Sequence, residues 1–222
     1  MGAAVLSEKM NSFLSSLGIP EDKGQRALYD QLIEKDFPTT KNEYWKYTRV
    51  GKISNSKFKK GLMTEDKGLR EKFLLDGNCL VVENGILRDD FTYETISGVT
   101  VTSVKPGDEH KISGFGKDVN LNHVFSLLNA AYYQEIIHIR IAAKTEMETP
   151  LKLVLITSGE NIICNPRIFI HVEKSAQAKI TAQFLSLNSK DSFCNVVSEF
   201  IIEENARLTI DKLQNESEGN FH

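Results

Sequence analysis

The fold is decided by residues 164–180, CNPRIFIHVEKSAQAKI, which return in altered form as residues 194–210, CNVVSEFIIEENARLTI. Three correspondences carry this repeat: Cys164-Asn165 with Cys194-Asn195, Phe169–Glu173 with Glu199–Glu203, and Ser175–Ile180 with Asn205–Leu208. Apolar and polar residues alternate within the matched stretches, as they do in half-buried strands. The sequence therefore predicts β-structure that repeats along the chain.

The spacing of the strands indicates how they stack. The middle residues of successive strands are Leu153, Ile170, Ile180, Phe200 and Leu208, and strands two apart are separated by 27, 30 and 28 residues. A period near 28 with two strands per period and no intervening helix is typical of a β-solenoid, in which each strand pairs in parallel with its counterpart one coil later. A β-sandwich, which also has short strands at regular spacing, is the alternative.

The front of the chain follows a helical pattern instead. Apolar residues between Leu6 and Leu17 recur every three or four positions, and a second apolar face runs from Ala27 to Ile33 and stops before Pro38. We divide the chain into a helical region at 1–75 and a β-rich region at 76–222. Within the second region, Asn84-Gly85 predicts a hairpin, residues 121–133 predict one more helix, and the coils occupy about 134–222. No capping element follows the last strand, so we expect the chain to be the front part of a longer protein.

Positive charge is concentrated between residues 41 and 60. This segment holds seven basic residues against Glu43, so it is net +6 and the rest of the chain is net −9. The aromatic residues among these charges are Tyr44, Trp45, Tyr47 and Phe58. One interpretation is a nucleic-acid patch with base-stacking aromatics. We favour the other, in which the aromatics dock on the core, the lysines stay solvated, and Trp45 is mostly buried against the β-region.

Composition excludes several classes of protein. The 222 residues are 41% hydrophobic with a net charge of −3, which predicts neither a nucleic-acid nor a membrane partner for the whole molecule. Three cysteines do not make a disulfide framework, so we expect a reducing, cytoplasmic environment. The longest aliphatic run, Leu153–Ile156, is too short to span a membrane, and no targeting segment is evident.

Motifs for catalysis are missing from the sequence. Gly114-Phe115-Gly116 is followed by Val119 where the third glycine of a dinucleotide loop would stand. The histidines fall at no metal-binding spacing; they are His110, His123, His138, His171 and His222. We therefore predict a non-enzyme and assign no catalytic, cofactor-binding or metal residue.

Cys164 and Cys194 would be neighbours on successive coils if the repeat is real. They are either a functional thiol pair for metal or sulfur, or a buried ladder of small side chains beside an Asn165–Asn195 ladder. We favour the ladder, since a four-thiolate cluster site needs more cysteines than the chain has. His138 and His171 are expected at the surface or facing a partner, and the residues expected as solvated turn carboxylates are Glu173, Glu203 and Glu204.

Residues 37–48, FPTTKNEYWKYT, resemble the SufB/SufD family of iron–sulfur assembly scaffold proteins, whose N-terminal region carries a P-[ST]-x-x-[ND]-E-x-W-[KR]-[YF]-[ST] signature. Later stretches are similar to the SufD branch, with the SufB branch as the near alternative; they are Leu127–Ala131, Pro150-Leu151 and Glu204–Leu208 before Leu213-Gln214. The resemblance implies a helical N-terminal region, a right-handed parallel β-helix and a further helical domain.

The resemblance also implies a function. Members of the SufD branch act as non-catalytic scaffold subunits that pair with SufB and with the SufC ATPase, or form a homodimer when SufB is absent. The resemblance implies that a transient iron–sulfur cluster forms at the interface of the full complex, and we expect none to be held stably by this chain alone. A polysaccharide-active β-helix enzyme is a rival, but Glu199 and Asp211 do not align on one strand of successive coils.

Overall fold

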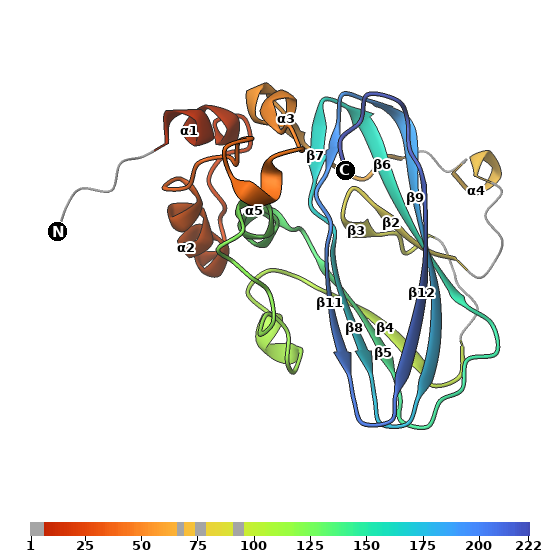
Figure 1. The fold of residues 1–222 in the computed structure, drawn as a ribbon. Coiled ribbons are helices and arrows are strands. Elements are labelled where there is room, and N and C mark those ends of the chain that lie inside the picture. Colours follow the sequence, from red (N-terminus) through yellow and green to blue (C-terminus); the bar gives the residue numbers. More distant parts are fainter. Residues whose placement is uncertain (1–6, 66–68, 74–78, 91–95) are drawn as a thin grey trace.

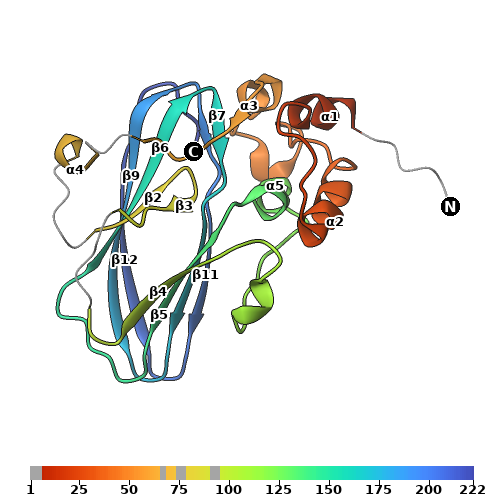
Figure 2. The ribbon, with the colours of Figure 1, turned by 180° about the vertical axis from the view of Figure 1, so that it is seen from behind.

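The computed structural model describes residues 7–65, 69–73, 79–90 and 96–222. The described helices are α1 (Glu8–Leu14), α2 (Lys23–Leu32), η1 (Glu43–Trp45), α3 (Gly51–Asn55), α4 (Leu69–Lys72), η2 (Glu109–Lys111) and α5 (Val124–Tyr132). Figures 1 and 2 show α1, α2, α3 and α5 gathered on one side of a column of strands. The chain is therefore a mainly β protein with a helical front end.

The predicted helices at the front of the chain are confirmed as α1 and α2. Side chains cap both: the Ser7 hydroxyl accepts a hydrogen bond from the Met10 N–H at 3.2 Å, and Asp22 accepts one from the Gln25 N–H at 2.9 Å. After α1 the chain turns through Gly18, whose φ of 75° lies in the left-handed region that favours glycine. The helix predicted at 121–133 is confirmed as α5.

The strands form three sheets. In chain order they are β1 (Lys59–Lys60), β2 (Cys79–Glu83), β3 (Ile86–Leu87), β4 (Val99–Val104), β5 (Ile136–Ile141), β6 (Leu151–Glu160), β7 (Ile162–Cys164), β8 (Arg167–Val172), β9 (Gln177–Lys190), β10 (Phe193–Cys194), β11 (Val197–Ile202) and β12 (Arg207–Asn215). The sheet orders are β12-β9-β6-β2-β3, β11-β8-β5-β4 and β1-β7-β10. From β6 onward the chain visits the three sheets in a fixed rotation, so every third strand returns to the same sheet.

The predicted parallel pairing is confirmed. β9 pairs in parallel with β6 and β12, and β8 pairs in parallel with β11, with Phe200 opposite Ile170 and Ile210 opposite Ile180. The antiparallel pairs in the described chain, β2 with β3 and β4 with β5, both lie before β6. Neighbouring strands of the repeat therefore do not form the hairpins that a β-sandwich would use.

Two features of the repeat differ from the sequence-based prediction. Each period has three strands rather than two. The sequence pattern did not reveal the third strand, because β7 and β10 have only three and two residues and show no alternation. Parallel stacking also involves strands earlier than residue 134, since β2 pairs with β6 and β1 pairs with β7. The hairpin at Asn84-Gly85 is confirmed, and both residues have positive φ, as its tight turn requires.

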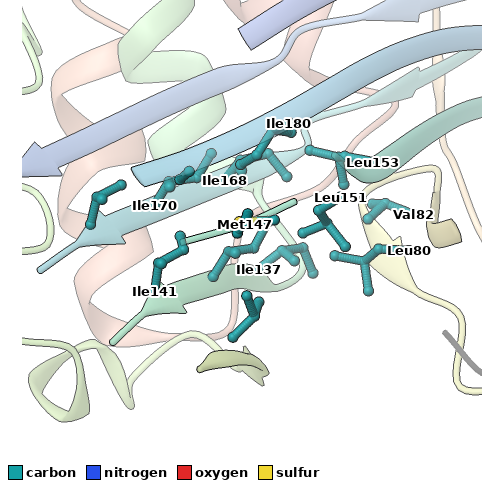
Figure 3. Packing of buried hydrophobic residues seen from close by; sticks show 14 of the residues in the cluster. Leu80, Val82, Ile137, Ile141, Met147, Leu151, Leu153, Ile168, Ile170 and Ile180 are labelled. Atoms are coloured by element: carbon teal, nitrogen blue, oxygen red, sulfur yellow. The ribbon is translucent and has the colours of Figure 1, made fainter. Parts of the chain in front are cut away.

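The inward-facing side chains of the two long sheets make the main core. Figure 3 shows Leu80, Leu153, Ile137, Ile170 and Ile180 pointing into the space between the sheets. All five are almost completely buried, and each such aliphatic side chain contributes about 1.5–3 kcal/mol of burial free energy. The repeat is therefore held together by a continuous apolar interior, as stacked coils require.

A second core joins the helices to the short strands. Phe13 of α1 and Leu127 of α5 pack in one cluster with Phe58, Ile163 of β7 and Phe193 of β10. Phe13 meets Phe58 edge-on at a ring-centroid distance of 5.8 Å, and Phe58 meets Phe193 at 6.1 Å. This cluster fixes the N-terminal segment against the sheet β1-β7-β10, which we call the narrow sheet and where the candidate site lies.

The last coil leaves its inward-facing residues uncovered. Phe200, Ile202 and Ile210 are 41%, 49% and 38% exposed. Their register partners one coil earlier, Ile170, Val172 and Ile180, are at most 2% exposed. The apolar interior is therefore open at the β11–β12 end.

Candidate functional site

Cys164 and Cys194 are directly paired on the parallel strands β7 and β10. Both thiols are free and buried. The Thr157 hydroxyl lies 3.8 Å from the Cys164 sulfur. The prediction that the two cysteines are neighbours is therefore confirmed.

The predicted asparagine ladder is confirmed beside the cysteines. Asn195 donates its amide to Asn165 Oδ1 at 2.9 Å and to the Phe125 carbonyl at 3.0 Å. Asn129 of α5 donates to the carbonyls of Pro166 and Asn195 at 2.9 and 2.7 Å. Buried amides with satisfied hydrogen bonds fix the register of β7 and β10, and they hold α5 against this corner of the stack.

His222 occupies the equivalent position one coil after Cys194. We call the three stacked positions Cys164, Cys194 and His222 the rungs. Phe221 pairs in parallel with Phe193, and the Cys194 N–H donates to the Phe221 carbonyl at 2.9 Å. The next residue, His222, therefore lies one coil beyond Cys194. Sequence spacing between histidines did not reveal this position, whereas the coil period does, because residue 222 follows residue 194 by 28 places.

Charged groups surround the imidazole. His222 Nδ1 lies 3.1 Å from a Glu216 carboxylate oxygen, and Nε2 lies 3.1 Å from Lys212 Nζ. Hydrogen bonds to Cys194 and Glu216 raise the pKa of His222 to about 9, while burial acts in the opposite direction. The hydrogen bond with Cys164, followed by burial, raises the pKa of Cys194 well above its ordinary value. Cys194 is therefore a thiol at neutral pH and not an activated nucleophile.

The cluster opens on a hollow of about 410 Å³ between the N-terminal segment and the narrow sheet. Its lining includes Trp45, His123, Cys194, Lys212 and His222. The three rungs follow one another along the stack, with about 4.8 Å between neighbouring strands, so they do not converge on one point. In the described part of the chain no group of three or more His, Cys, Asp or Glu side chains is placed to hold a metal ion.

Trp45 lies at the rim of this hollow and is mostly buried, as predicted. Its ring packs on His123 and Phe125, each at a centroid distance of 5.4 Å, and so joins the cluster that reaches the narrow sheet. Phe58 is fully buried, as predicted. Tyr44 and Tyr47 are almost fully exposed, which contradicts the prediction that the aromatics of this segment dock on the core.

The remaining histidines behave differently from each other. His171 is half-buried, and its Nε2 lies 2.8 Å from Glu203, which agrees with a surface position. His138 packs on Phe169 at 5.3 Å, and its Nε2 has no hydrogen-bond partner among the described residues. Burial, and then the charges of His171 and Arg140, lower the pKa of His138, so it is neutral at neutral pH.

The predicted turn carboxylates lie in turns but are not free. Glu173 pairs with Arg140 and accepts the Ala143 N–H at 3.0 Å. Glu203 accepts the Lys174 N–H at 2.9 Å, and Glu204 pairs with the Lys174 ammonium at 2.6 Å. These carboxylates close the turns between coils, which is a structural role.

The glycine-containing segment at 114–116 covers a buried ion pair. The Arg167 guanidinium contacts the Glu199 carboxylate, and both side chains are buried. The Gly116 N–H donates to the other Glu199 oxygen at 2.9 Å, and the Phe115 ring lies 5.0 Å from the guanidinium. Glu199 is on β11 and Asp211 is on β12, so these residues lie in different sheets, as the sequence indicated.

Comparison with known proteins identifies the repeat. Residues 154–222 match the family model described as the SufBD core domain of the SUF system for FeS cluster assembly. The chain is also similar to an iron–sulfur cluster assembly SufBD family protein of Synechocystis, with 28% identity over 213 residues. The chain is therefore similar to the SufB/SufD family. This bears out the resemblance carried by the Trp45 motif.

The SufBD core match begins within β6 and takes in the Cys164–Cys194–His222 rungs and the open last coil. The alignment with the Synechocystis relative covers 87% of this chain and 47% of the relative, so the chain spans about half the relative's length. Among the described residues, no helix is both long enough and apolar enough to cross a membrane.

Proposed function

We propose that the chain belongs to the SufB/SufD family and is a cytoplasmic scaffold subunit of the SufD type, which pairs with SufB and with the SufC ATPase and has no enzymatic activity by itself. The similarity to that family supports a role in iron–sulfur cluster assembly. We further infer that β6–β12 form a right-handed parallel β-helix, since the chain visits three parallel sheets in a fixed rotation. A SufB-like subunit is the alternative within the family.

The observation that carries the scaffold proposal is the chemistry of the Cys194 corner. Two thiols and an imidazole are stacked in a row, each one coil from the next, and their side chains do not converge on one ion. Cys194 keeps its proton at neutral pH, so it is a poor metal ligand as it stands. Such a corner can contribute one or two ligands to a cluster that a partner completes, and we propose that the cluster is cargo formed at the interface of the full complex.

The test of partnership is co-purification of the full-length protein with its cognate SufB and SufC. We expect a complex with one copy of this subunit beside SufB, and a homodimer when SufB is omitted. Two copies of this subunit with SufC, formed equally well when SufB is present, would contradict a SufD-type role.

The test of cluster binding is anaerobic reconstitution of this chain with ferrous iron and sulfide, followed by desalting and absorbance spectroscopy. We expect no charge-transfer band to survive desalting. A stable band that disappears in Cys194→Ser but persists in Cys79→Ser would overturn the proposal. Cys79 is a suitable control because it lies in a different buried cluster, with Leu69 and Val81.

A polysaccharide-active enzyme is not supported by the carboxylates of the repeat. Glu199 is buried and forms an ion pair with Arg167. Glu173 pairs with Arg140, and Glu203 accepts a hydrogen bond from the Lys174 N–H. A glycosidase needs two carboxyl groups facing one cleft at about 5–9.5 Å. We therefore propose no catalytic role for these residues.

A further inference from the structure

Two tyrosines that lie three residues apart in the N-terminal segment are almost fully exposed. Tyr44 is 97% exposed and Tyr47 is 90% exposed, whereas Trp45 between them is turned onto His123 and Phe125. Aromatic side chains bury large apolar areas when they can, and exposed tyrosines are enriched at protein–protein interfaces. These two residues therefore indicate a contact surface.

The local sequence holds this surface in place. Asn42 Oδ1 accepts hydrogen bonds from the Thr39 N–H at 2.8 Å and from the Thr39 hydroxyl at 3.2 Å, which closes the turn after Pro38. Backbone bonds then run from the Trp45 N–H to the Asn42 carbonyl and from the Thr48 N–H to the Trp45 carbonyl. We call residues 43–49 the tyrosine ridge. Because Trp45 anchors the ridge, presenting Tyr44 and Tyr47 costs little further entropy on binding.

A hollow of about 860 Å³ lies beside the ridge. Its charged lining consists of Lys9, Lys46 and Arg49 against Asp36. Tyr47 forms part of the wall, and Thr39, Thr40 and Thr48 offer hydroxyl groups. The hollow therefore combines excess positive charge with polar groups and an aromatic side chain.

The basic residues between positions 41 and 60 are not neutralised within the described chain. All seven are exposed, and none forms an ion pair with another described residue; they are Lys41, Lys46, Arg49, Lys52, Lys57, Lys59 and Lys60. In the repeat, by contrast, Arg140, Arg167 and Lys174 each have a carboxylate partner. The N-terminal segment thus keeps a positive field free for an external partner.

We propose that the tyrosine ridge and the hollow beside it form a docking site for an acidic peptide segment of a partner protein. In this site Lys9, Lys46 and Arg49 face carboxylates of the segment, and Tyr44 and Tyr47 cover its apolar side chains. The site does not rest on the proposed scaffold function.

Two observations favour an acidic peptide over a nucleic acid. The rest of the chain carries a net charge of −9, which repels a long polyanion but acts less on a short segment confined to the basic face. Trp45, the side chain best suited to base stacking, is packed inward, which leaves tyrosines typical of protein interfaces.

The test uses a fluorescein-labelled sixteen-residue peptide made of four Glu-Glu-Leu-Glu repeats, with fluorescence anisotropy read at 50 and 300 mM salt. We expect saturable binding that weakens about fivefold or more at the higher salt. Lys46→Glu with Arg49→Glu should weaken binding about tenfold, and Tyr44→Ser with Tyr47→Ser should also weaken it. The matched control, Lys179→Glu with Lys190→Glu, changes two exposed lysines of β9 and should leave binding unchanged.

Several results would overturn the proposal. They are no saturable binding of the peptide, equal loss of affinity in the ridge and β9 variants, and equal binding of a peptide in which glutamine replaces every glutamate. A sixteen-residue oligothymidylate that binds the ridge more tightly than the acidic peptide would also overturn it. Circular dichroism of each variant separates loss of binding from loss of fold.

Discussion

Arg167 and Glu199 provide a sensitive test of how the repeat is held together. Replacing Arg167 with Met keeps most of the apolar stem but removes the guanidinium. The change leaves the Glu199 carboxylate buried with only the Gly116 N–H as a partner at 2.9 Å. It also removes the contact of the guanidinium with Phe115 and its 3.4 Å contact with Asn129.

The size of the effect follows from the burial of both groups. Breaking a buried pair by removing one partner costs about 3–5 kcal/mol, because an uncompensated charge is left in a poorly solvated position. Replacing both groups is much milder, so Arg167→Met with Glu199→Leu should recover most of the lost stability. Arg167→Lys keeps the charge without the planar guanidinium, and it should fall between wild type and Arg167→Met.

The pH dependence of the stability loss in Arg167→Met shows whether the loss comes from the charge of the buried Glu199 carboxylate. Burial is the main cause that raises the pKa of Glu199 in the folded protein, and loss of the opposing Arg167 charge raises it further. A group whose folded pKa is raised favours the folded state at low pH, and this contribution is lost as pH rises through the folded pKa. The deficit of Arg167→Met relative to wild type should therefore be larger at pH 7 than at pH 5.

The assay is urea unfolding followed by circular dichroism at both pH values, with wild type, the two single Arg167 variants and the double variant. A deficit below about 1 kcal/mol at pH 7 would refute the reasoning. So would a deficit that does not shrink at pH 5, because the cost would then come from packing rather than from charge.

Three further expectations follow from the coil geometry. Asn195→Ala should destabilise the fold by about 1–3 kcal/mol in urea unfolding, since buried acceptors lose their donor, whereas the exposed Asn215→Ala should have no measurable effect. Ile170→Ala should cost about 2–5 kcal/mol and its register partner Phe200→Ala much less, and equal costs would mean that the last coil is covered. Alkylation of Cys194 by iodoacetamide, measured by mass spectrometry, should keep accelerating above pH 9 because its pKa is raised; a plateau at or below pH 9 would contradict this.

Periodicity was enough to predict the long strands and their pairing. Ile170 opposite Phe200 and Cys164 opposite Cys194 both follow from the repeat, because inward-facing residues must return to the same place on each coil. The short strands β7 and β10 escaped prediction because two or three residues carry no alternation. The exposure of Tyr44 and Tyr47 also escaped it, since a cluster of aromatics fits both a docked and an exposed segment.

The His222 position shows what a period can add to a search for sites. Motif spacing compares residues close in sequence, so a histidine 28 residues after a cysteine has no significance by itself. In a chain that returns to the same strand position every 28 to 30 residues, that same separation makes the two residues neighbours, as the Phe193–Phe221 pairing shows. Residues separated by one period should therefore be compared as if they were adjacent. Applied here, that comparison groups Cys164, Cys194 and His222 at one position of three successive coils, and the Cys194 variants proposed above test what this corner does.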